Sequence, residues 1–103
     1  MALRNSQGIT RITMKPTAIT KCQIGQDWYK HEFYIEFVPG DFYPDYMEEE
    51  KWIMANIDGM ELNIEDAVSI LYNHINKAYN PKELHITDYI SGNKVHFDVI
   101  VEK

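Results

Sequence analysis

The stretch WYKHEFYIEFVPG, residues 28–40, decides the fold of this chain. Successive side chains of an extended strand point to opposite faces, and here the two faces differ in chemistry. One face carries Tyr29, His31, Phe33, Ile35 and Phe37, and the other includes Lys30, Glu32 and Glu36. This alternation predicts a half-buried strand, which ends at Pro39-Gly40.

Further strands are expected on both sides of this one. Residues 8–21 are rich in threonine and isoleucine, and Pro16 interrupts them, so we expect one bent or broken strand there. Toward the C-terminus, residues 83–90 and 94–102 alternate again and are joined by the turn-forming triplet Ser91-Gly92-Asn93. This arrangement predicts a β-hairpin.

Two helices are expected between the strands. A short helix is predicted from Tyr46 to Ala55. A longer one shows apolar residues at helical spacing, namely Ile64, Ala67, Val68, Leu71, Ile75 and Ala78. Asn63 is its expected N-cap, and the helix should end at Tyr79-Asn80 because Pro81 cannot continue it.

The predicted fold class is α+β, with the element order β-β-α-α-β-β. An antiparallel four-stranded sheet with both helices on one face would bury that face and leave the other in water. We expect a single domain over residues 1–103, with residues 1–7 as a flexible N-terminus. His31, Phe33 or their neighbours on the less-covered side are expected to meet a partner subunit, and the alternative is that the aromatic residues fill a small core.

Composition excludes several classes of partner. The formal net charge is −6, so attraction to nucleic acid phosphates or anionic lipid is not expected. Cys22 is the one cysteine and cannot form an internal disulfide, which favours a reducing compartment and a cytoplasmic location. No apolar run has the length of a signal peptide core or of a membrane span.

A thiol and three carboxylates could carry chemistry. Cys22, beside Lys21, could act as a thiolate nucleophile, and Asp27 could transfer protons if the intervening turn folds it back. Glu65 and Asp66 open the long helix, and one of them could accept hydrogen bonds from the N–H groups of a heterocycle. The structural alternatives are a small buried cysteine for Cys22, a turn residue for Asp27, and helix capping and first-turn electrostatics for Glu65 and Asp66.

The four histidines show no spacing typical of a zinc centre, so no metal is expected. His74 is interpreted as a partly buried structural residue on the long helix. His31, His85 and His96 lie on predicted strands and could meet in space. The acidic run Glu48–Glu50 is most simply a solvated helix face.

Several of these features occur together in one known superfamily. The features are the element order, Cys22, Gly25-Gln26-Asp27, Phe37-Val38-Pro39, Glu65-Asp66 and Asn80-Pro81. Over residues 20–88 the chain resembles the tunnelling-fold enzymes. Within them it is most similar to the 7-cyano-7-deazaguanine reductases, the QueF-like nitrile oxidoreductases of queuosine biosynthesis.

This resemblance implies an enzyme that acts on a purine- or pterin-like base at a subunit interface. Cys22 resembles the nucleophile that adds to the nitrile, Asp27 the proton donor and Glu65 the anchor of the base. The resemblance also implies NADPH as hydride donor. A homo-oligomer, as a ring or stacked rings, is expected because this fold closes its sheets into a barrel by joining subunits.

The chain departs from the family pattern at three places. The segment from Cys22 to Asp27 is two residues shorter, and Ile64 stands where the family has histidine before Glu65. The lysine-rich cofactor motif is replaced by residues 47–52, whose three glutamates would repel a phosphate. These departures favour the alternative of a non-catalytic oligomeric binding or structural module, and a zinc-dependent pterin synthase or cyclohydrolase is a third hypothesis.

Overall fold

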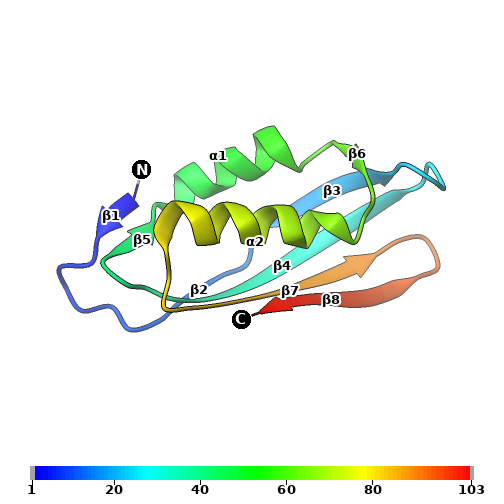
Figure 1. Cartoon of the computed structure of the whole chain (residues 1–103). Helices are drawn as coiled ribbons and strands as arrows, with labels where there is room; N and C mark the ends of the chain where they lie inside the picture. Colours follow the sequence, from blue (N-terminus) through cyan, green and yellow to red (C-terminus); the bar gives the residue numbers. More distant parts are fainter. Residues whose placement is uncertain (1, 103) are drawn as a thin grey trace.

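The computed structural model describes residues 2–102 of the chain. Their elements, shown in Figure 1, are β1 (Ala2–Arg4), β2 (Ile12–Met14), β3 (Thr17–Cys22), β4 (Trp28–Val38), β5 (Phe42–Pro44), α1 (Tyr46–Asn56), β6 (Glu61–Leu62), α2 (Asp66–Tyr79), β7 (Glu83–Ser91) and β8 (His96–Glu102). The α+β class is confirmed, and Figure 1 shows both helices on one face of the main sheet.

The main sheet contains six strands among the described residues, not four. Its order is β6-β3-β4-β7-β8, and β2 also pairs with β4. The pairs are antiparallel except that of β6 with β3, which is parallel. The expected break at Pro16 is confirmed, because β2 and β3 flank it. The two-residue β6 is too short to show any alternation, so the four-strand prediction missed it.

A second, small ladder lies outside the main sheet. β1 pairs with β5 in antiparallel register, from Ala2 opposite Pro44 to Arg4 opposite Phe42, and the Asn5 N–H donates to the Asp41 carbonyl at 2.8 Å. Where residues 1–7 were expected to be flexible, Ala2–Arg4 therefore form a strand. Three residues that pair with a distant segment leave no local pattern in a sequence.

The core lies between the helices and the facing side of β4 and β7. Phe33 and Ile35 are each 1% exposed, and Phe37 and His31 are fully buried. The prediction that His31 and Phe33 meet a partner subunit is therefore wrong. Both residues belong to the core, in agreement with the alternative that the aromatic residues fill a small core. The opposite face keeps large side chains in solvent, including Ile19, Trp28, Tyr89 and Ile100, with exposed fractions of 51%, 54%, 47% and 60%.

Both helices start and stop for local reasons. α1 follows Asp45, whose carboxylate accepts from the Met47 N–H at 3.1 Å. α2 begins at Asp66, and its N-cap is Glu65. The prediction that Asn63 is the N-cap was therefore wrong by two residues. The Asn63 carbonyl instead accepts from the Asp66 N–H. The predicted end is confirmed, because Asn80 caps α2 in the left-handed conformation before Pro81.

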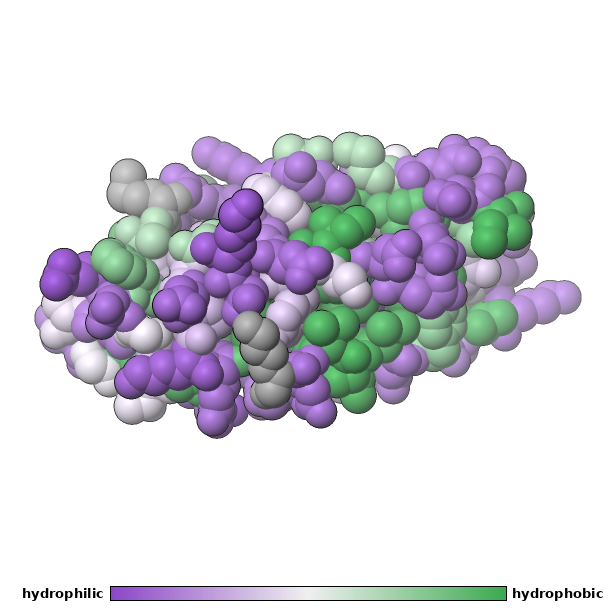
Figure 2. Space-filling model, in the orientation of Figure 1, coloured by the Kyte–Doolittle hydropathy of each residue, from purple (hydrophilic) through white to green (hydrophobic). Residues whose placement is uncertain are grey.

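The surface in the same orientation shows apolar side chains gathered near the middle of the molecule, with hydrophilic side chains on both sides of them (Figure 2). Neither of the two described helices has the length and apolar character needed to cross a membrane.

Candidate functional site

The turn after β3 brings the backbones of Cys22 and Asp27 together. The Cys22 N–H donates to the Asp27 carbonyl at 2.8 Å, and the Gln26 N–H donates to the Cys22 carbonyl at 2.8 Å. Gln26 closes the turn in the left-handed region, with a φ of 63°. The Gly25 N–H lies 3.5 Å from the Cys22 Sγ, so one backbone donor points at the sulfur.

The short strand β6 attaches the start of α2 to this turn. Cys22 is opposite Leu62 in the parallel pair, and the Gln23 N–H donates to the Leu62 carbonyl at 3.1 Å. The Gln26 side chain also donates to Glu61 at 3.0 Å. Because Glu65 follows Leu62 by only three positions, Cys22, Asp27 and Glu65 lie at the same end of the molecule, where Figure 1 shows β3, β6 and the start of α2.

The three candidate residues differ in exposure. Cys22 is half-buried, whereas Asp27 and Glu65 are exposed. Glu65 is the N-cap residue of α2 but makes no side-chain capping bond. Lys21 alternates to the other face of β3, where its Nζ lies 6.0 Å from the centroid of the Trp28 ring. The cation next to the thiol in sequence is therefore engaged with an aromatic ring on the opposite face.

Three cavities lie elsewhere on the described part of the chain, with volumes of about 210, 370 and 180 Å³. The first lies between α1 and the bend at Pro16. The other two lie on the open face of the sheet and share Glu32 and Tyr89. Cys22, Asp27 and Glu65 do not line these three cavities.

A buried polar network, which sequence analysis missed, lies on the same face of the sheet as Cys22. Thr20 Oγ1 is 2.6 Å from His31 Nε2, and His31 Nδ1 is 2.7 Å from Asp88 Oδ2. All three residues have no exposed surface. The order hydroxyl, imidazole, carboxylate is that of a nucleophile activated by a base, but complete burial denies any substrate access to the Thr20 hydroxyl.

Burial dominates the electrostatics of this network. Desolvation raises the pKa of Asp88 from its ordinary value, and the hydrogen bond and charge of His31 oppose the shift without cancelling it. The Asp88 Oδ1 atom has no hydrogen-bond partner among the described residues. The imidazole also stacks on Phe33, with the ring centroids 5.5 Å apart, so its orientation is fixed from three sides.

A second polar cluster joins the two helices and corrects the interpretation of the acidic run. Glu49 is only 5% exposed, because its carboxylate accepts from the Tyr79 hydroxyl and lies 3.0 Å from His74 Nε2. Trp52 stacks on His74 with the ring centroids 3.8 Å apart. The middle glutamate of the run is thus not solvated but ties α1 to α2, and the structural role predicted for His74 is confirmed.

The remaining histidines do not converge. His31 faces the helices, whereas His85 and His96 lie on the open face at opposite ends of the hairpin. His85 Nδ1 is 2.9 Å from Glu102 Oε2, and His96 lines one of the open-face cavities with Asp98. Over residues 2–102, no group of three or more histidine, cysteine, aspartate or glutamate side chains is arranged to hold a metal ion.

Comparisons with known proteins identify the fold. No family model matches the chain, and no curated protein matches it. Among solved structures, the crystal structure of the archaeosine synthase QueF-like in the apo form superposes with a TM-score of 0.81 and 21% sequence identity, covering 94% of this chain and 96% of that chain. The likeness spans nearly the whole of both chains, and at this identity it shows that they share a fold.

Proposed function

From the QueF-like tunnelling fold that the chain adopts, we propose an enzyme that binds a purine- or pterin-like base at a subunit interface and attacks it with Cys22. The observation that carries the proposal is the turn that joins Cys22 to Asp27 beside the start of α2. The structurally similar protein is an archaeosine synthase, which supports a base of the 7-deazaguanine class.

In this proposal each candidate residue has one role. The exposed Glu65 carboxylate accepts hydrogen bonds from the N–H groups of the base. The Asp27 carboxylate takes the proton of the Cys22 thiol, and the resulting thiolate attacks the carbon of a nitrile such as that of 7-cyano-7-deazaguanine, forming a C–S bond. The electron pair released from the C≡N bond goes to nitrogen, which takes that proton from Asp27. The product of this step is a covalent thioimide, and Asp27 is left as a carboxylate.

The surface of α1 does not suit the phosphates of NADPH. Glu50 lies at the cavity beside α1, and Glu49 is already engaged with Tyr79 and His74. A carboxylate at this surface repels a phosphate instead of binding it. Reduction of the nitrile by NADPH therefore stays a prediction from the resemblance, and our proposal stops at the covalent adduct.

The adduct can be detected by intact mass. Protein incubated with 7-cyano-7-deazaguanine should gain the mass of one nitrile per chain, and Cys22→Ala should gain none. Asp27→Asn should slow adduct formation about 100-fold, the lower end of what a positioned acid contributes. Asp98→Asn, on the open face of the sheet, is the matched control and should react like the unmodified chain. Absence of both an adduct and a ligand-induced rise in melting temperature would reject the proposal.

The alternative is a binding module of the same fold without chemistry. The isoleucine at position 64, where the family has histidine, and the glutamates 48–50, which replace the family's lysine-rich motif, favour it. In that case the base should raise the melting temperature of Cys22→Ala as much as that of the unmodified protein, with no mass increase in either.

One metal analysis of the purified protein tests the hypothesis of a zinc-dependent pterin synthase or cyclohydrolase.

A homo-oligomer is part of this proposal. The exposed apolar side chains on the open face support it, as does the outer edge of β8, which pairs with no further strand among residues 2–102. Sedimentation at micromolar concentration should show an assembly of several chains. A strict monomer would remove the subunit interface at which the base is proposed to bind.

A further inference from the structure

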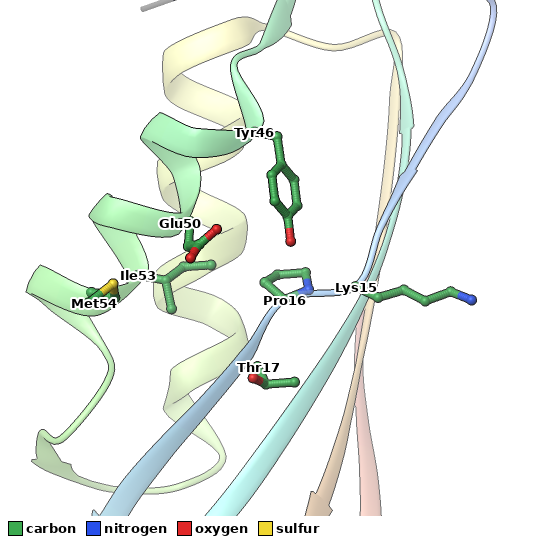
Figure 3. Close-up of a pocket in the computed structure, with 7 residues that line it drawn as sticks. All are labelled: Lys15, Pro16, Thr17, Tyr46, Glu50, Ile53 and Met54. Carbon is green, nitrogen blue, oxygen red and sulfur yellow. The ribbon is translucent and has the colours of Figure 1, made fainter.

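The cavity between α1 and the bend at Pro16 has the features of a separate binding site. Its volume is about 210 Å³. Pro16 interrupts the strand beside this cavity. The Pro16 carbonyl accepts from the Phe33 N–H at 2.9 Å, and Figure 3 shows the Pro16 ring directed toward α1. Ile53 and the Tyr46 ring also point into the space. Two segments 30 residues apart, at Pro16 and Tyr46, therefore line one opening with both apolar and polar groups.

The charge at this cavity is negative. Figure 3 shows the Glu50 carboxylate directed toward the Pro16 ring and Tyr46. Lys15 also lines the cavity, but its side chain runs away from it, and its Nζ lies 5.5 Å from the centroid of the Tyr34 ring. Its positive charge is thus engaged on the other side of the strand. A carboxylate beside an electron-rich ring attracts a cation and repels an anion.

We propose that this cavity binds small organic cations, in which a primary ammonium group is carried by a short apolar body. The ammonium group donates to the Glu50 carboxylate and lies against the face of Tyr46. The apolar body packs on Pro16 and Ile53. The volume is below the roughly 300–1,000 Å³ of cavities that take drug-sized ligands, which limits the ligand to a few carbon atoms. The site is separate from Cys22 and does not depend on the proposed function.

Three probes of similar size separate charge from shape: n-butylammonium, 1-butanol and butyrate. Each is titrated into the full chain while the backbone amide signals are followed by nuclear magnetic resonance. Butylammonium should shift the signals of Thr17, Glu50 and Ile53 in a saturable way. Butanol should bind several-fold more weakly, and butyrate should produce no saturable shift. Equal binding of butanol and butylammonium would overturn the proposal.

The variant Glu50→Gln keeps the shape of the side chain and removes its charge. Affinity for butylammonium should fall about fivefold, near the upper end for one exposed ion pair. Glu83→Gln, at the start of β7 and outside the cavity, removes the same charge elsewhere and should bind normally. Raising the salt concentration should weaken binding to the unmodified protein only. Unchanged affinity in Glu50→Gln, or shifts spread over the whole surface, would reject the site.

Discussion

Two groups of polar residues lie on the same face of the sheet and differ in almost every physical respect. The Cys22 turn is held by backbone hydrogen bonds, and its acids are exposed. The Thr20–His31–Asp88 network is held by side-chain hydrogen bonds and has no exposed surface. Access to solvent, not the presence of nucleophile, base and acid, therefore separates a candidate site from a structural network. We expect variants of the first group to change reactivity and variants of the second to change stability.

The largest effect on stability is expected at His31. His31→Ala removes the partner of a buried carboxylate and leaves a cavity, so the free energy of unfolding should fall by about 3–5 kcal/mol. His96→Ala, on the exposed edge strand, is the matched control and should change it by less than about 0.5 kcal/mol. Chemical denaturation measures both. Equal stability of the two variants would mean that the buried network contributes nothing to the fold.

The pH dependence of stability tests the raised pKa of Asp88. A raised pKa in the folded state means that folding favours the neutral carboxyl. The stability contributed by that proton is fully present below the ordinary carboxyl pKa of about 4 and is lost as the pH rises through the folded-state value. The unmodified chain should therefore lose stability relative to Asp88→Asn as the pH increases above about 4. A constant difference between the two proteins would contradict the shift.

A smaller effect separates two neighbouring glutamates of α1. Glu49→Gln should lower the free energy of unfolding by about 1–3 kcal/mol, because it weakens a buried hydrogen-bonded cluster with His74 and Tyr79. Glu50→Gln, one residue along and exposed, should change it by less than about 0.5 kcal/mol. Thermal unfolding compares the two variants directly. If both behave alike, the acidic run is a solvated face after all.

The smallest effect is expected at Cys22 itself. The side chain is half-buried, so Cys22→Ala should lower the free energy of unfolding by less than about 1.5 kcal/mol while abolishing the adduct with the nitrile. A loss of unfolding free energy as large as that expected for His31→Ala would show that the thiol is a core residue. Cys22 would then be a structural residue like those of the Thr20–His31–Asp88 network.

Sequence predicted the elements whose pattern is local and repeated. Residues 28–38 alternate through several periods, and the apolar spacing of residues 64–78 and the Asn80-Pro81 stop are equally local. β6 has two residues, and the three residues of β1 pair with the distant β5, Ala2 with Pro44 and Arg4 with Phe42, so neither strand has a pattern to detect.

The buried network was missed for a related reason. Along residues 28–38, His31 looks like one more aromatic side chain on the apolar face. Its partners Thr20 and Asp88 are 11 and 57 residues away, and only the sheet register joins them. A second register, the parallel pairing of β3 with β6, places Cys22 opposite Leu62. Sequence analysis linked Cys22 with Glu65 only through the family resemblance. A polar residue within an otherwise apolar strand face was the one available signal.

We propose that Cys22 reacts with a nitrile-bearing base at a site completed by a second copy of the chain. The most direct test follows the initial rate of adduct formation per chain by intact mass over a protein dilution series, with sedimentation reporting assembly at each concentration. We predict that the rate per chain falls as the assembly dissociates. A monomer that reacts as fast as the assembly, or an assembly that forms no adduct at any concentration, would contradict this account.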